Sequence, residues 1–486
     1  MQDQKNPWTQ QRWIGALLLI AAAQYAWNAY DVLALSGYDA GAHAGYLLTL
    51  VREGRLPHPL EGWQTFHPPA YYLLASVVWR ISEPAGPEVL GLALRAVGAL
   101  AWLGAGLVAH ALARGLGAGA ATAAVATALV WLTPCNQISA VMLGNEAFGA
   151  ALAAFALPFV LRLQRDPGDV RAAVAAGLLA GLAMATKYSG VWIAAACAVP
   201  FLGRRPDRRT LRALGAGLLV GSVLSGPVYL RNLALTGTPL PMTRDQEPVK
   251  SAEAALELRP RRIADYLWID PGSLRRPSIY QLPAEPGSFA HRNPAMTNIW
   301  GLLYAASWYD PFAQRVPIAQ HEDQVLWGPL LLLLGLVPTA LLVLGFVLST
   351  REVIRTRARA PTAPLTVMAW LALASFVAFT WRVPTLGAAK ASYLMPLAVP
   401  AALFFARGAQ ALGPRRRAGA LALSAVAALV AGLVFTSGLV FQPDRRAERI
   451  LVRTWLYYGE KLPGSHIGEA VRLLYGLPDP EASPSR

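Results

Sequence analysis

Long apolar runs are the feature that most constrains how this chain can fold. The hydrocarbon core of a bilayer is about 30 Å thick, and a helix of about 20 apolar residues crosses it. The candidate runs lie at 13–33, 88–113, 119–134, 143–161, 171–186, 188–202, 211–231, 325–348, 363–381, 391–406 and 418–441, with a shorter one at 68–82. We therefore expect an all-α polytopic membrane protein with about 11–12 transmembrane helices.

Composition supports this class and excludes others. Of the 486 residues, 55% are hydrophobic and only 15% are charged, whereas soluble domains are about 45–50% apolar and about 25% charged. This balance excludes a soluble extracellular protein, a disordered chain and a nucleic-acid-binding module. The two cysteines, Cys135 and Cys197, both lie in apolar runs, which excludes a disulfide scaffold and argues against a cysteine-based zinc site.

The net charge of +15 indicates orientation rather than nucleic-acid binding. Cytoplasmic loops of membrane proteins carry an excess of Lys and Arg. The short basic loops of this chain lie at 162–171, 203–212, 351–359 and 407–417. We expect these loops to be cytoplasmic, so the opposite side holds the segments 34–67, 232–324, 382–390 and 442–486.

This alternation predicts four parts. Residues 1–231 form an N-terminal transmembrane catalytic module with an outer loop at 34–67. Residues 232–324 form a large extracytoplasmic loop, residues 325–441 the C-terminal transmembrane helices, and residues 442–486 an extracytoplasmic tail with a short amphipathic helix at 446–458. The first run follows Lys5 and Arg12, and we expect an uncleaved anchor there rather than a signal peptide.

The run at 68–82 decides the side on which the first loop lies. Fifteen helical residues reach only about 22 Å, which is too short to span a bilayer unaided. We therefore place 34–67 outside with the other extracytoplasmic segments. A complete crossing of 68–82 would put that loop in the cytoplasm instead.

The large loop 232–324 is rich in prolines and aromatics, and Trp300, Tyr304, Trp308 and Tyr309 follow a helical spacing. So many aromatic residues argue against disorder. Two alternatives stay open for this loop. It either covers a site on the helical bundle or folds only on its own aromatic residues.

Polar residues gather at the predicted helix ends. Asp39 and His43 have i, i+4 spacing and share one face if this segment is helical, which suits a general-base pair, two metal ligands, or merely an N-cap Asp with an incidental His. His67 precedes Pro68 and Pro69, which are typical of a helix start. That helix end could attract an anion, or the two prolines could only mark the start of the helix.

Three further ionisable residues interrupt apolar sequence. Glu146 enters an apolar helix, and Lys187 separates two such helices, followed by Tyr188. Lys187 could snorkel to the interface, pair with Glu146, or bind an anion. Lys390, with Tyr393 three residues later, places a second basic residue on the less basic side, as a phosphate site would require.

The ordered set of motifs resembles a known family. A Tyr38-Asp39 motif follows the first apolar helix, and His67-Pro68-Pro69 with two tyrosines comes about thirty residues later. Asn145-Glu146 then heads a helix, Thr-Lys-Tyr-Ser-Gly occupies 186–190, and Lys-Ala-Ser-Tyr-Leu-Met-Pro occupies 390–396. Over roughly residues 10–410 this order resembles the polytopic C-type glycosyltransferases, in the branch of the protein O-mannosyltransferases and the bacterial lipid A aminoarabinose transferase.

The resemblance implies a reaction: an inverting transfer of a hexose or pentose from a polyprenyl-phosphate carrier to an extracytoplasmic hydroxyl. It implies that Asp39 is the general base and that five further residues bind substrate, namely His67, Glu146, Lys187, Lys390 and Tyr393. His43 and Tyr188, which stand within the same polar clusters, are the two other candidate substrate-binding residues. It implies as partners the lipid-linked donor, membrane lipids and a lipid, glycan or protein acceptor, with no nucleic acid.

The chain departs from the family pattern at one position. Family members often carry a second acidic residue directly after the first, but here Ala40 follows Asp39. We therefore expect no metal and no cofactor, although His43 could supply a second metal ligand. The composition suggests a bacterial inner membrane, with the site facing the periplasm. A transporter or lipid flippase is the alternative, in which Glu146 and Lys187 would line an ion pathway.

Overall fold

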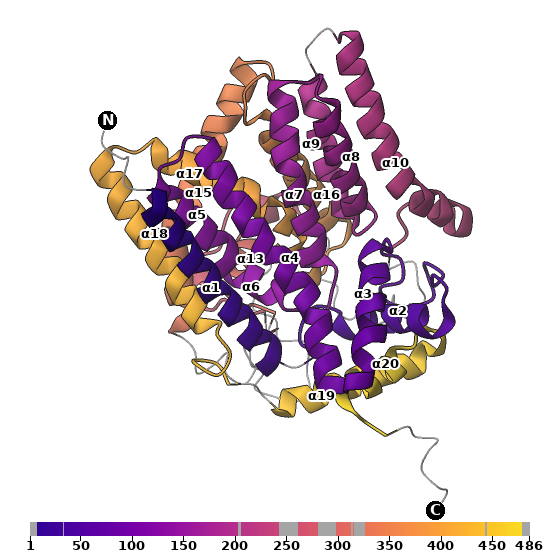
Figure 1. Cartoon of the computed structure of the whole chain (residues 1–486). Coiled ribbons are helices and arrows are strands. Elements are labelled where there is room, and N and C mark those ends of the chain that lie inside the picture. Colours follow the sequence, from indigo (N-terminus) through magenta and orange to yellow (C-terminus); the bar gives the residue numbers. More distant parts are fainter. Residues whose placement is uncertain are drawn as a thin grey trace, which may run out of the picture.

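The structure is a computed structural model that describes residues 7–32, 34–202, 206–242, 261–279, 298–312, 314, 326–442 and 445–478. Arg204, Arg205, Ser288, about half of the loop 232–324 and the end of the tail lie outside the described residues. Helices make up the regular structure of the described ranges (Figure 1). The predicted all-α polytopic fold is confirmed, and the chain is an integral membrane protein.

The helices occupy every predicted apolar run. In the described part of the chain, seven segments are long and apolar enough to cross a membrane: α4 (Pro87–Gly115), α7 (Glu146–Arg165), α10 (Arg208–Thr236), α15 (Trp327–Arg355), α16 (Ala363–Arg382), Gly387–Gln410, which ends in α17 (Ala398–Gln410), and α18 (Pro414–Val434). Shorter apolar helices are α5 (Ala120–Leu132), α8 (Val170–Met184) and Tyr188–Phe201, which contains α9 (Val191–Ala198). The helix α1 (Pro7–Asp31) takes the first run.

One predicted run is divided in the structure. The run 119–134 ends as α5 at Leu132, and a separate short helix, α6 (Pro134–Ala140), follows. Thr133 between them has an extended backbone, as expected for a residue before proline. Pro134 then fits the first turn of α6, where its missing N–H costs no hydrogen bond.

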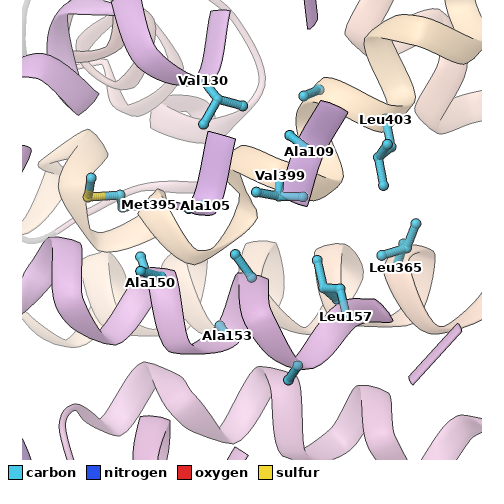
Figure 2. Packing of buried hydrophobic residues seen from close by; sticks show 14 of the residues in the cluster. Ala105, Ala109, Val130, Ala150, Ala153, Leu157, Leu365, Met395, Val399 and Leu403 are labelled. Atoms are coloured by element: carbon cyan, nitrogen blue, oxygen red, sulfur yellow. The ribbon is translucent and has the colours of Figure 1, made fainter. Parts of the chain in front are cut away.

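The largest core lies where α4, α5, α7, α16 and α17 meet. Figure 2 shows this packing, with alanines of α4 and α7 facing larger side chains of their neighbours. The labelled residues are Ala105, Ala109, Val130, Ala150, Ala153, Leu157, Leu365, Met395, Val399 and Leu403. Small side chains let helices approach closely in lipid, which explains the Ala-rich sequence of these spans.

The helices α8 and α10 lie side by side at the edge of the bundle (Figure 1). A Cβ on Gly177 would lie within 3 Å of the carbonyl oxygen of Gly217, so only glycine allows this approach. The other faces of α10 are largely exposed, including Leu218, Leu219 and Leu230. An apolar exposed face suits contact with lipid tails.

The basic loops gather at one end of the bundle. Arg209 pairs with Asp166 at 3.0 Å, which joins the loops 203–212 and 162–171. Gln164 donates to the carbonyl of Ala358 at 2.9 Å, which places the loop 351–359 beside the loop 162–171. Arg407 pairs with Glu352 of the same region. Four separate basic loops therefore share one end of the molecule.

The first loop begins and ends at the other end of the bundle. Arg95, in α4, donates to the carbonyl of Val32 just after α1. Between these helices lie α2 (Ala40–Glu53) and α3 (Ala70–Ser82), which run side by side, with Arg80 donating to the carbonyl of Leu50 at 3.1 Å. The short helix α3 therefore lies with α2 at this end of the bundle, between the end of α1 and the start of α4.

Two further parts pack on this end. In the large loop, α13 (Ile299–Trp308) lies against α15, where a Cβ on Gly335 would meet the ring of Trp308. The described part of this loop is therefore packed on the bundle and not only on itself. In the tail, the expected amphipathic helix is α19 (Arg445–Lys461), and a second helix, α20 (Ile467–Tyr475), follows it.

Candidate active site

An ion pair joins the first outer loop to the late Lys-Ala-Ser-Tyr segment. The Nζ of Lys390 lies 3.5 Å from Oδ2 of Asp39. The Asp39 side chain is 29% exposed and that of Lys390 14%, so the carboxylate is accessible to a substrate. Asp39 is the residue before α2, and Lys390 lies between two short 3-10 helices, η7 (Leu386–Ala389) and η8 (Ala391–Leu397).

A second ion pair lies beside the first and is more deeply buried. The Nζ of Lys187 lies 2.6 Å from Oε1 of Glu146, and both side chains are at most 10% exposed. Of the three readings of Lys187, pairing with Glu146 is the one observed, and Lys187 does not snorkel. The other oxygen of Glu146, Oε2, is buried without a hydrogen-bond partner in the structure.

The ring of Tyr393 connects the two pairs. The Nζ of Lys187 lies 5.5 Å from its centroid and the Nζ of Lys390 lies 6.0 Å from it. Lys390 also lies 4.3 Å from the ring centroid of Tyr38. Aromatic faces attract cations within about 6 Å, so the two tyrosines hold both ammonium groups around one small region.

The histidines form a third layer against the ion pairs. His43 Nδ1 is 2.6 Å from the hydroxyl of Tyr72, and its ring stacks on that of His67 with centroids 6.0 Å apart. Burial lowers the pKa of His43 below its ordinary value and lowers that of His67 further. Both rings are therefore neutral at pH 7. Nδ1 of His67 is buried and has no hydrogen-bond partner in the structure.

Tyr188 lies at the edge of this group. Its hydroxyl donates to the carbonyl of Phe66 at 2.7 Å, and its ring centroid lies 6.2 Å from that of His67. Asn232, near the end of α10, donates to the same hydroxyl at 3.3 Å. Tyr188 therefore links the start of α3 to α10, beside the site rather than among its charges.

Asp39 has an uncommon backbone conformation. Its φ of 58° is left-handed, which Asp tolerates better than most residues but at a cost. Its carbonyl accepts from the amides of Ala42 and His43 at 3.0 and 3.1 Å, and its side chain makes no cap bond to α2. The carboxylate is thus free to face Lys390, and strain of this kind gathers at functional sites.

All eight candidate residues therefore meet in one region, at the end opposite the basic loops. Two further residues of the site, Tyr38 and Tyr72, had no role predicted from the sequence. Both stand within the quoted motifs, beside Asp39 and after Pro69. Tyr38 stands next to an ionisable residue and Tyr72 lies near a helix start, and tyrosines are too common at membrane interfaces for either position to be singled out.

The described residues contain no group of three or more His, Cys, Asp or Glu side chains placed to hold a metal ion. Asp39 and Glu146 each face a lysine instead. The charges of the site are two carboxylates and two ammonium groups. This arrangement suits an anionic substrate held by lysines, with one carboxylate available as a base.

The fold defines a class, the polytopic membrane proteins with a polar site at one end of the bundle. Residues 66–227 match the family model of dolichyl-phosphate-mannose-protein mannosyltransferases. No curated protein matches the chain. The matched range includes His67, Glu146 and Lys187, so the predicted resemblance is confirmed over this part of the chain.

Solved structures share the fold. The apo oligosaccharyltransferase of Archaeoglobus fulgidus is 16% identical with a TM-score of 0.53, covering 99% of this chain and 62% of that chain. Apo ArnT of Cupriavidus metallidurans is 17% identical with a TM-score of 0.50, covering 96% and 76%. AglB of Archaeoglobus fulgidus in complex with an inhibitory peptide and a dolichol-phosphate is 15% identical with a TM-score of 0.53, covering 99% and 62%. The chain thus spans less than two thirds of the archaeal enzyme.

Proposed function

We propose that the chain is an inverting glycosyltransferase that moves a hexose or pentose from a polyprenyl-phosphate carrier to an acceptor hydroxyl. The observation that carries the proposal is the Asp39–Lys390 ion pair beside the buried Glu146–Lys187 pair. The family match over 66–227 and the shared fold support it. One of the similar structures holds a dolichol-phosphate, which is a lipid phosphate of the proposed kind.

In this reaction Asp39 accepts the proton of the acceptor hydroxyl. The hydroxyl oxygen then bonds to the anomeric carbon of the sugar from the face opposite the phosphate. The bond between that carbon and the phosphate oxygen breaks, and its electron pair leaves on the polyprenyl phosphate. A positioned general base contributes about 10²–10⁴-fold to such a step, and a nearby carboxylate also stabilises an oxocarbenium-like transition state.

The lysines stabilise the charge that develops on the leaving phosphate. An ammonium group has three donors, so Lys390 can contact Asp39 and a phosphate oxygen together. Lys187 adds a second charge, held in place by Glu146. Nδ1 of His67, which has no partner in the structure, is available to a polar group of the donor.

The orientation follows from the charge distribution. The end that carries the basic loops is cytoplasmic under the positive-inside rule, and the site therefore faces the opposite side. We place the protein in a bacterial inner membrane with the site open to the periplasm. The acceptor is a lipid, glycan or protein on that side, and the reaction uses no metal, because the acidic residues of the site face lysines.

Purified protein in nanodiscs, offered radiolabelled polyprenyl-phosphate sugars and extracts of periplasmic acceptors, tests the proposal. We expect release of polyprenyl phosphate and a labelled product, in the presence of EDTA as well as without it. Movement of the intact donor across proteoliposomes without bond cleavage would support the transporter or flippase alternative. Mass spectrometry of the glycolipid, polysaccharide and glycoprotein fractions of a deletion strain then identifies the acceptor.

A further inference from the structure

We propose that the C-terminal helices α19 and α20, with the turn between them, position Asp39 for catalysis, with Trp455 as the main positioning residue. We call residues 445–475 the C-terminal clasp. The proposal rests on the proposed function, because it concerns the base of that reaction.

The clasp packs on the same helix that Asp39 precedes. A Cβ on Gly41, two residues after Asp39, would lie within 3 Å of the Trp455 ring. One turn later, a Cβ on Gly45 would meet the carbonyl oxygen of Ser465 at 2.5 Å. These approaches leave no room for a side chain, so the clasp touches the backbone of α2 directly below the Asp39 turn.

The clasp also holds the far end of α2. His466, at the start of α20, contacts Glu53, the last residue of α2. Glu469 of α20 pairs with Arg52 at 3.2 Å. The helix that follows Asp39 is thus fixed at its first turn by an aromatic ring and at its last turn by ion pairs.

The clasp and α2 pack together through buried hydrophobic side chains. The shared cluster includes the fully buried Leu47 of α2 and Tyr72 of α3 together with Trp455 at 7% exposure and Ile467 at 1%. Trp455 is flanked by Trp63 of the outer loop, with ring centroids 6.4 Å apart. Movement of Trp455 therefore shifts α2 rather than the clasp alone.

Asp39 needs such support for a physical reason. Its left-handed backbone is retained only where the surroundings enforce it, and its side chain makes no cap bond to α2. A catalytic group displaced by about 1 Å can lose about 100-fold in rate. The position of α2 consequently determines whether the carboxylate meets the acceptor hydroxyl.

The test compares Trp455→Ala with Trp455→Phe and with Thr454→Ala, an exposed neighbour on α19. We expect Trp455→Ala to lower kcat about tenfold or more with an unchanged KM for the donor. Trp455→Phe should restore most of kcat, and Thr454→Ala should resemble the wild type. Hydrogen exchange at residues 40–46, measured without substrate, should be faster in Trp455→Ala only.

His466→Asn is the second variant, because Asn tolerates the left-handed φ of 51° at this position. This substitution loosens the other end of α2, and we expect it to lower kcat less than Trp455→Ala does. It keeps the proposal testable if Trp455→Ala fails to fold. Unchanged exchange at 40–46, or unchanged kcat despite faster exchange, would overturn the positioning role. Absence of transfer by the wild-type protein would overturn the proposed function instead, which separates the two failures.

Discussion

The ammonium group of Lys390 lies 3.5 Å from the carboxylate of Asp39, although the two residues belong to opposite halves of the chain. The pair joins the outer loop after α1 to the short 3-10 helices before α17. Its position beside the Glu146–Lys187 pair brings a candidate base and two candidate phosphate ligands into one region.

Asp39→Asn keeps the shape of the side chain and removes its basicity. Transfer should fall at least about 100-fold, the low end of a general-base contribution, while expression and thermal unfolding stay close to the wild type. Asp166→Asn, at the basic end of the bundle, is the matched control and should transfer normally. Wild-type turnover by Asp39→Asn would refute its assignment as the base.

Lys390→Met and Lys187→Met remove the proposed phosphate contacts. Hydrogen bonds to charged groups contribute about 1.5–3 kcal/mol, so each variant should weaken donor binding about tenfold or more. Acceptor binding should change less. Titration of purified protein with polyprenyl phosphate measures the effect, and unchanged affinity in both variants would exclude the phosphate role.

Lys187→Met also leaves Glu146 as a buried, unpaired carboxylate. Loss of one partner of a buried pair costs about 3–5 kcal/mol, so this variant should unfold at a lower temperature than the wild type. The double variant Glu146→Gln/Lys187→Met removes the uncompensated charge and should recover most of the stability. Equal unfolding temperatures for the single and double variants would show that the pair is not the cause.

The pair between His466 and Glu53 should make the stability of the C-terminal clasp depend on pH. Burial lowers the pKa of His466, but hydrogen bonds to Glu53 and Glu469 outweigh burial and raise it above its ordinary value of 6.5. The hydrogen bond from His466 holds the pKa of Glu53 below its ordinary value of 4.5. The other charged groups around this contact are Arg52, Arg55, Glu61 and Glu83.

The directions of these two pKa shifts determine how the stability contributed by the pair depends on pH. The pair contributes fully between about pH 4.5 and 6.5, is lost at higher pH as His466 deprotonates, and is lost at lower pH as Glu53 gains a proton. The gain is at most about 1 kcal/mol, because both side chains are partly exposed. Unfolding midpoints of wild type and His466→Asn should differ most within this window and converge at pH 9. A pH-independent difference would contradict the prediction.

Cysteine labelling tests the orientation. In a background of Cys135→Ala and Cys197→Ala, single cysteines at Ser36 and at the exposed Leu267 should react with an impermeant thiol reagent in intact cells with a permeable outer membrane. A cysteine at Thr385 should also react, more slowly because Thr385 is buried. Ser288, within the same predicted loop, should behave like Leu267.

Gly413→Cys, between α17 and α18 at the basic end, is the control and should stay protected. Protection at Ser36 together with reaction at Leu267 would place Asp39 and the large loop on opposite sides of the membrane. The single-site glycosyltransferase proposal would then fail, and the transporter alternative would gain support.

The class of the protein and most of its helices could be predicted from the sequence, because the bilayer imposes on each span a length and an apolar composition that can be recognised along the chain. It also placed the candidate residues at helix ends, where ionisable groups interrupt apolar runs. Pro68 and Pro69 marked the start of α3, which begins at Ala70, because proline restricts the backbone locally. These features depend on short stretches of chain.

Which of these groups meet depends on the packing of helices that are far apart in the sequence. That Lys187 pairs with Glu146 and Lys390 with Asp39 depends on how helices distant in the chain pack together, and one-dimensional patterns carry no such information. The contact of Trp455 with the backbone of Gly41 could not be predicted from the sequence either. The sequence of the tail predicted an amphipathic helix but did not indicate what that helix packs against. Gly41 allows this last contact, since a Cβ at Gly41 would lie within 3 Å of the Trp455 ring and force the two helices apart.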